Sequence, residues 1–401
     1  MTALTLFPPD RTAALERLAA FAPKAGRDYA ARRNYDHGPG AHTSVSTLSP
    51  WLRCRLITEE EVIRTVLGRH SLATAEKFIQ EVFWRTYWKG WLQLRPSVWD
   101  QYRTDLRRRH DDVQTQSGLR DRWEAACSGA TEIRCFDFWA RELRETGYLH
   151  NHARMWFASI WIFTLELPWE LGADFFLRHL LDGDPASNTL SWRWVAGIQT
   201  PGKTYLARTS NISKFTEGRF HPRWQLAGEA RAIEAPAPPA AGILPPPDTP
   251  RPGLRSGFLL HEDDLSPGFA LENTDLIAAA VLAPQTGFSP LHPAPHVAGF
   301  RTAAAKDAAE RWAGRIGSAP TPVTDAQALE NWAAAENLEQ IITPRAPVGP
   351  VADCLATLAS RPDAPRIAQI TRDYDQRAWP HATRGFFPFR KHIPELVDAL
   401  A

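Results

Sequence analysis

The spacing of apolar residues changes once along the chain, and this change divides it into two blocks. In the first block apolar residues recur three and four positions apart, which is the pattern of helices with one buried face. Its clearest stretch is 75–94, where one face collects Phe78, Val82 and Trp91 behind a candidate N-cap at Thr74. Because no alternating strand pattern precedes residue 200, the first block is predicted to be all-helical, with further helices at 11–21 (capped by Asp10), 136–146, 150–165 and 175–181.

In the second block short apolar runs alternate with helical patterns. This rhythm is typical of a parallel sheet with helices on both faces. No GxGxxG or Walker A sequence occurs there, so no motif supports a nucleotide site. Strands are predicted at 257–260, 276–283, 340–343 and 367–371, and helices at 303–316, 325–336 and 351–359.

A proline-rich segment, EAPAPPAAGILPPPDTPRPG, separates the two blocks. Proline removes backbone donors and favours an extended chain, so this segment is predicted to join two domains. We predict a helical domain at 1–233, a linker at 234–253 and an α/β domain at 254–401. The expected fold class is mainly α, followed by a smaller, Rossmann-like α/β domain with a parallel sheet.

Composition narrows the class of protein. The 46 basic and 45 acidic residues leave a formal charge of +1, so nucleic-acid binding would need a local basic patch. Twelve of the 16 tryptophans lie between Trp51 and Trp194, a cluster that suits stacking on planar ligands or electron transfer. The four cysteines form no CxxC pair, so no metal site is expected. With no signal peptide and no apolar run long enough to span a bilayer, we expect a cytoplasmic monomer without membrane contact.

The stretch 181–197, LDGDPASNTLSWRWVAG, gathers two carboxylates, an amide and two indoles. A DGD sequence alone is more often a turn than a site, but acceptors, an amide and flat rings together suit a planar heterocycle. Upstream, Arg154 is either a surface arginine or part of a buried helix beside Trp156 and Phe157. In a buried helix it would need a carboxylate partner, for which Asp182 is a candidate.

Two further stretches carry candidate chemistry. Ser46, Thr47 and Ser49 present hydroxyl groups in a loop that runs into a helix, an arrangement that can hold a phosphate. Glu81 and Trp84 share a helix face with Arg85, which is either a solvated stripe or a surface for stacking on a base. A buried Glu81 without a partner would be costly, so a ligand that hydrogen-bonds it is expected.

Four motifs occur in a specific order: STLSP (46–50), EVFWR (81–85), TGYLHNHARM (146–155) and LLDGDPASNTLSWRWVAG (180–197). Their order and spacing resemble the FAD-binding helical domain of the DNA photolyase and cryptochrome family, over about residues 10–215. The resemblance implies bound FAD. It implies an Arg154–Asp182 ion pair beside the isoalloxazine ring and Asn188 facing flavin N5. It also implies that Asp184 accepts a hydrogen bond from that ring and that Gly183 is among the cofactor-binding residues. The implied contacts to the diphosphate and ribityl chain are Tyr35, Ser46, Thr47, Leu48 and Ser49.

The resemblance also implies an activity: light-driven repair of cyclobutane pyrimidine dimers in DNA, the lyase reaction of a deoxyribodipyrimidine photolyase. Trp84, Arg85 and Asn151 would contact DNA, and Met155 stands where a histidine is expected in (6-4) photolyases. The alternative is a cryptochrome-like blue-light photoreceptor without repair activity. The implied pocket for a flipped dimer consists of Glu81, Trp84, Asn151, Met155 and Trp194.

Trp192 and Trp169 match the two inner members of the family's electron-transfer chain. The outermost member would fall near Val113 or Gln114, and neither residue can relay an electron. The tryptophans that could substitute are Trp88, Trp91, Trp99, Trp156 and Trp161.

Three departures from the family pattern stand out. Val45 replaces a common threonine, and the segment after Trp194, GIQTPGKTYLARTSNISKF, lacks the usual FNP-like ending. The helical domain comes first, and the C-terminal block resembles a shortened version of the antenna domain that family members usually place before it. The domain order is therefore predicted to be permuted, and the sequence leaves an antenna chromophore unspecified.

Overall fold

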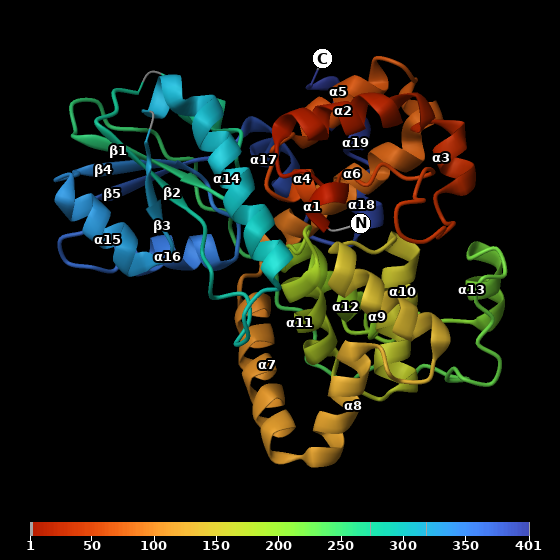
Figure 1. Cartoon of the computed structure of the whole chain (residues 1–401). Helices are drawn as coiled ribbons and strands as arrows, with labels where there is room; N and C mark the ends of the chain where they lie inside the picture. The colour runs from red at the N-terminus through yellow and green to blue at the C-terminus, as the bar shows by residue number, and fades with distance from the viewer. Residues whose placement is uncertain (1–2, 273, 318, 401) are drawn as a thin grey trace.

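Helix α6 (Leu72–Gln93) runs through the middle of the helical half. The proline-rich segment and the C-terminal helices both pack against it. The computed structural model describes residues 3–272, 274–317 and 319–400. Figure 1 shows the helical half beside a smaller sheet-containing half, with α14 (Pro295–Ile316) between them. The other helices of the first half are α1 (Ala3–Leu6), α2 (Arg11–Phe21), α3 (Arg27–Arg32), α4 (Ser49–Arg53), α5 (Glu59–Leu67), α7 (Ser97–Thr115), α8 (Ser117–Ser128), α9 (Arg134–Thr146), α10 (Asn151–Ser159), α11 (Trp169–His179), α12 (Pro185–Val195) and α13 (Thr209–Phe215).

The helical periodicity located the long helices but not all of their ends. Ser71, not Thr74, caps α6: its hydroxyl accepts a hydrogen bond from the Thr74 amide at 3.3 Å. The helix predicted at 150–165 changes to a π-helical turn at Ile160–Thr164. Helices α7 and α8, which were not predicted, form the arm at the bottom of Figure 1.

The second half contains a five-stranded, fully parallel sheet in the order β3-β2-β1-β4-β5. The predicted fold class, a mainly α chain with a smaller parallel α/β part, is confirmed. Strand β3 is short and was not predicted. The strands are β1 (Ser256–His261), β2 (Ala278–Leu282), β3 (Thr321–Val323), β4 (Gln340–Pro344) and β5 (Arg366–Ile370).

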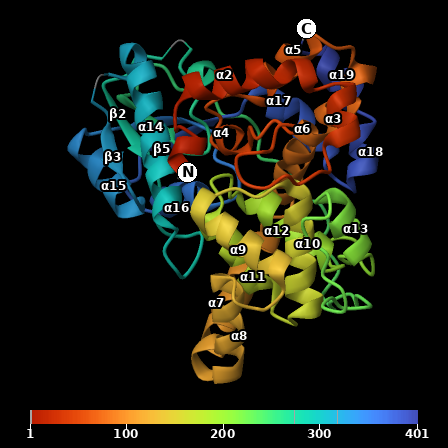
Figure 2. The same ribbon diagram turned by 45° about the vertical axis from the view of Figure 1, so that its right-hand side comes forward.

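Alternate side chains of each strand enter different cores, as the two-residue period of a strand requires. Phe258 and Leu260 of β1 join the large core that continues into the helical half. Leu259, between them, joins a smaller core under α15 (Ala326–Ala335) and α16 (Pro350–Ala359). One face of the sheet is therefore covered by α14 and the helical half, and the other by α15 and α16 (Figure 2).

After β5 the chain returns to the helical half. Three short helices, α17 (Asp373–Ala378), α18 (Phe386–Arg390) and α19 (Ile393–Asp398), pack on α6. The Tyr374 and Thr86 hydroxyls are 2.8 Å apart, and the Tyr87 hydroxyl donates to the Arg384 carbonyl at 2.8 Å. The block predicted as an α/β domain thus ends in a helical segment built onto α6.

The proline-rich segment carries no helix or strand, and all of its residues are among those described. It lies against the end of α6, where Arg95 donates to the Pro239 carbonyl at 2.9 Å and the Gly242 amide to the Leu94 carbonyl at 2.8 Å. In the part of the chain that the structure describes, no helix combines the length and apolarity needed to cross a membrane.

Gly90 of α6 allows the C-terminal segment to approach closely. A Cβ at this position would lie 2.9 Å from the ring and 3.0 Å from the backbone of Trp379. We predict that Gly90→Ala destabilises the protein by about 1–3 kcal/mol despite the better helix propensity of alanine, because a packed core resists an added methyl group. The control is Gly118→Ala on α8, where a Cβ meets nothing within 4 Å. Thermal unfolding that ranks the two variants equally would contradict this account.

Candidate functional site

The turn between α11 and α12 holds both aspartates of the DGD sequence. Asp184 is the N-cap of α12, and its Oδ1 accepts a hydrogen bond from the Ser187 amide at 2.8 Å. Asp182 accepts two hydrogen bonds from the Arg154 guanidinium, at 3.0 and 2.8 Å. Arg154 also donates from Nε to the Leu149 carbonyl at 2.9 Å. The sequence is therefore both a turn and the place where Arg154 finds its carboxylate partner.

Asp184 lies in a strongly positive environment. Its carboxylate is buried, with Lys89 Nζ at 3.5 Å and a guanidinium nitrogen of Arg85 at 3.8 Å. Burial alone would raise the pKa of Asp184, but the charges of Lys89 and Arg85 outweigh it and hold that pKa well below the usual range. Burial and the nearby Arg85 lower the pKa of Lys89. The turn thus presents a fixed negative charge opposite α6.

Arg53 of α4 connects this turn to the sheet. Its Nε donates to the Gly183 carbonyl at 3.1 Å. Its other nitrogens donate to the Glu262 carbonyl at 2.9 Å and to the Glu262 carboxylate at 3.1 Å, and approach the Asp263 carboxylate at 3.1 Å. These acidic residues directly follow β1. One buried guanidinium therefore joins the DGD turn to the carboxyl end of a central strand.

The first turns of α12 place Asn188 and Trp192 beside α11. The Asn188 Nδ2 group donates to the Ala173 carbonyl at 2.8 Å. The Trp192 ring lies edge-on to Phe176, with centroids 5.1 Å apart, and its Nε1 is buried without a hydrogen-bond partner. A Cβ on Gly172 would lie 2.4 Å from this indole, so only glycine admits the ring there.

Trp169 begins α11, and its closest described aromatic neighbour is Tyr102, at 5.6 Å between centroids. Tyr102 in turn lies 5.3 Å from Trp99, both on α7. Neither Val113 nor Gln114 is aromatic, and Tyr102 was not among the substitutes considered from the sequence. Trp99 was among those substitutes, and Tyr102 stands three residues after it, so the apolar spacing of α7 marks Tyr102 as its neighbour on one helix face.

The serine- and threonine-containing loop borders a cavity of about 220 Å³. The cavity is lined by Ser46 and Thr47, by the cations Arg17 and Lys24, and by Tyr148. Arg17 donates to the Thr47 hydroxyl at 2.6 Å. His42 and Glu142, which also line the cavity, each keep one buried polar atom without a hydrogen-bond partner. These four charged or titratable residues were not identified from the sequence, because no local motif marks them.

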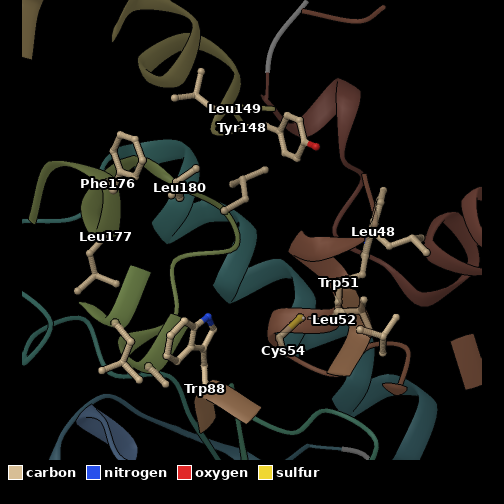
Figure 3. Packing of buried hydrophobic residues seen from close by; sticks show 14 of the residues in the cluster. Leu48, Trp51, Leu52, Cys54, Trp88, Tyr148, Leu149, Phe176, Leu177 and Leu180 are labelled. Atoms are coloured by element: carbon tan, nitrogen blue, oxygen red, sulfur yellow. Dashed lines mark hydrogen bonds between the residues drawn. The ribbon is translucent and has the colours of Figure 1, made fainter. Parts of the chain in front are cut away.

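The apolar wall behind this loop comes from several elements. Figure 3 shows Leu48, Trp51 and Leu52 on one side, Leu177 of α11 and Leu180 just after this helix on another, and Tyr148 between them. The Arg154 guanidinium lies 5.4 Å from the centroid of the Tyr148 ring. Tyr148 therefore lines the cavity and also contacts the Arg154–Asp182 pair. Tyr35 lies elsewhere, with its ring edge-on to Phe215 at 5.2 Å.

The five residues of the implied dimer pocket lie at the surface or only partly buried, and none of them lines this cavity. Glu81 forms an ion pair with Arg33, so its carboxylate has a partner within the chain and its burial does not by itself require a ligand. Trp84 is stacked face to face with Phe386, with centroids 3.7 Å apart. Trp194 stacks on Tyr205, with ring centroids 5.8 Å apart. The Tyr205 hydroxyl lies 3.3 Å from His152 Nε2, and His152 is the residue between Asn151 and the segment that leads to Met155 on α10. Arg85, with its side chain 14% exposed, faces Glu59 and Asp184.

Comparison with known proteins agrees with the motifs. Residues 78–224 match the family model described as the FAD binding domain of DNA photolyase. A deoxyribodipyrimidine photo-lyase of Streptomyces griseus is 31% identical over 216 residues, which are 49% of this chain and 46% of that relative. Residues 78–224 are a photolyase-type FAD-binding domain. The chain spans about half the length of the curated relatives that it matches.

Two solved structures resemble about half of the chain. Each covers 51% of it: a bacterial class III photolyase from Agrobacterium tumefaciens (28% identity, 42% of that chain, TM-score 0.43) and a cryptochrome from Synechocystis sp. PCC6803 (24% identity, 43% of that chain, TM-score 0.41).

The described residues fit an FAD. Arg17, Lys24, Ser46 and Thr47 provide cations and hydroxyl groups for a diphosphate, in a cavity too small for a whole dinucleotide. The orphaned atoms of His42 and Glu142 would pair with polar groups of the same ligand. The resemblance assigns Arg154, Asp182, Asp184 and Asn188 to the flavin ring, and the Arg154 guanidinium, 5.4 Å from the Tyr148 ring centroid, connects this group to the cavity.

We predict that Arg154→Ala lowers FAD content and affinity at least tenfold, because Asp182 would be left buried without its partner. Arg141→Ala on α9 is the control, since this arginine donates to the Gly129 carbonyl, away from the turn. Flavin absorbance of the purified proteins and titration of the apoproteins measure the effect. Equal FAD affinity in wild type and Arg154→Ala would contradict the assigned role.

Glu59 makes stability depend on pH. Burial would raise the pKa of this carboxyl, but Arg55 and Arg85 outweigh burial and lower the pKa from 4.5 to about 2. Its contribution, about 3 kcal/mol, is therefore present above pH 4.5 and is lost as the pH falls towards 2. Glu59→Gln should be less stable than wild type at pH 6, and the two should converge on acidification. Exposed Glu16→Gln is the control, and a constant difference between wild type and Glu59→Gln from pH 6 to 3 would contradict the assignment.

Proposed function

We propose that this chain is an FAD-dependent photolyase that repairs cyclobutane pyrimidine dimers in DNA. When bound, reduced FAD excited by blue light supplies the electron that opens such a dimer. The role of the chain is to hold the flavin in a dry pocket and to present a flipped dimer to it.

The observation that carries this proposal is that two turns of α6 carry both the residues that face the DGD turn and the residues proposed to bind the dimer. Arg85 and Lys89 face Asp184 of the DGD turn (residues 182–184), which we assign to the flavin and call the flavin turn. Glu81 and Trp84, in the preceding turn, are partly exposed, and we call these two residues with Asn151, Met155 and Trp194 the rim of the proposed dimer pocket. A dimer held by Glu81 and Trp84 would therefore lie next to the flavin turn, with no further element to cross.

Each rim residue has a chemical use in this proposal. Glu81 accepts hydrogen bonds from a base edge once Arg33 moves to a phosphate, and Trp84 offers an indole for stacking. Asn151, Met155 and Trp194 close the pocket from α10 and α12. Extruding the dimer costs a few kcal/mol, less than for an intact base, because a damaged base stacks poorly.

Two observations favour the alternative, a cryptochrome-like photoreceptor. Phe386 already covers one face of the Trp84 ring, and Arg33 already pairs with Glu81. A pocket satisfied by its own residues has less need of a dimer. A light-driven repair assay therefore has to decide between the two functions.

We predict that the reduced, FAD-loaded protein restores thymines in a dimer-containing oligonucleotide under blue light. Trp84→Ala should weaken dimer binding about 5- to 150-fold, because stacking on a base contributes about 1–3 kcal/mol. Trp224→Ala is the control, since this indole is 100% exposed and is not one of the residues of the proposed pocket. Dimers that persist with wild type, in single- and double-stranded DNA alike, would move the assignment to the photoreceptor.

A further inference from the structure

Helix α18 exposes one aromatic ring to solvent. Phe387 is 70% exposed, whereas its neighbours Phe386 and Phe389 are buried against α6. An isolated exposed apolar residue needs no explanation, but this one sits in an unusual electrostatic setting.

The charged residues that flank Phe387 in the sequence are all basic. Arg384, Arg390 and Lys391 are exposed around Phe387, and the Arg390 guanidinium lies 5.7 Å from the centroid of its ring. Residues 381–392, HATRGFFPFRKH, contain no aspartate or glutamate. The first acidic residue beyond them is Glu395, whose carboxylate lies 4.0 Å from His392. We refer to residues 384–391 as the aromatic-basic segment.

This segment adjoins the rim of the proposed dimer pocket. Phe386 stacks on Trp84, and the Tyr87 hydroxyl holds the Arg384 carbonyl, so two contacts fix the segment to α6. Two further cations on or beside α6 are ion-paired: Lys77, exposed one turn before Glu81, with Glu76 at 3.7 Å, and Arg33 with Glu81. Both views place α18 next to α6 (Figures 1 and 2).

We propose that the aromatic-basic segment binds single-stranded DNA, with Phe387 stacking on a base and Arg384, Arg390 and Lys391 contacting phosphates. The proposal deepens the proposed repair function, on which it rests, by naming the element that holds the strand beside the dimer. It also moves the phosphate contacts away from Arg85, which is buried in the ion pairs of the flavin turn.

The chemistry favours a single strand over a duplex. A protruding phenyl ring can stack only on a base whose face is free, and basic residues around such a ring follow the backbone without reading sequence. Phosphate neutralisation would make binding fall with salt, by about 0.7 logarithmic units for each contact and each tenfold rise in salt. The near-neutral chain would thus bind DNA through a local patch, as its overall charge requires.

The test measures binding of the full-length protein, in the dark, to a fluorescent oligothymidine of about ten nucleotides that contains no dimer. Phe387→Ala should weaken binding about 5- to 100-fold and Phe387→Trp should restore it, because an indole stacks at least as well. Arg390→Ala with Lys391→Ala should reduce the salt dependence by about 1.4 logarithmic units. Trp224→Ala, which removes a fully exposed ring beside Arg223, should leave binding unchanged. Unaltered thermal unfolding of each variant verifies the fold.

Equal affinity of wild type and Phe387→Ala for the oligonucleotide would overturn the proposal. So would Phe387-dependent binding to anionic phosphatidylserine vesicles without Phe387-dependent binding to DNA. Because the probe carries no dimer and the assay uses no light, its outcome is independent of repair. A protein that binds the probe through Phe387 but repairs nothing would support this inference and contradict the proposed function.

Discussion

The position of the DGD turn depends on the contacts of one buried group, the Arg53 guanidinium. It donates to the Gly183 carbonyl in the middle of the DGD turn and is held in place by Glu262 and Asp263 at the end of β1. Removing a charge from water is costly, and a buried arginine is tolerated only when its hydrogen-bonding capacity is used. Here that capacity is divided between the turn that carries Asp182 and Asp184 and the sheet of the other half. The DGD turn and the sheet are therefore parts of one electrostatic unit.

This contact also explains what the α/β half does. In doubly wound sheets, ligands bind outside the carboxyl ends of the strands, where the strand order reverses, which in this sheet is between β1 and β4. The residues that follow β1 instead bind guanidinium groups of the helical half: Glu262 and Asp263 hold Arg53, and Asp264 lies 3.1 Å from Arg55. Arg55 pairs in addition with Asp375, just after the sheet. The carboxyl ends of the strands, where a ligand would bind in other sheets of this kind, therefore hold the helical half in place.

The sequence predicts the parts of this arrangement that are local. Arg154 and Asp182 lie in motifs that can be read directly, and the apolar spacing of α6 marks its buried face. The decisive long-range contacts carry no such signal: Arg53 and Glu262 are 209 residues apart, and nothing near Trp84 announces Phe386. Helices α7 and α8 were missed because their many charged residues hide a narrow apolar stripe. The N-cap of α6 was misplaced by three residues because Ser71 and Thr74 can both cap a helix.

FAD affinity of Glu262→Gln tests most directly whether the α/β half fixes the DGD turn through Arg53. Glu262 belongs to the sheet half and contacts none of the predicted flavin residues, but it orients the guanidinium that holds Gly183. We expect this variant to bind FAD at least tenfold more weakly and with an altered flavin absorption spectrum, and Arg53→Met to do the same. Glu339→Gln, at the start of β4 and remote from Arg53, should match wild type. A folded Glu262→Gln protein with wild-type FAD affinity and spectrum would show that the two halves are only neighbours.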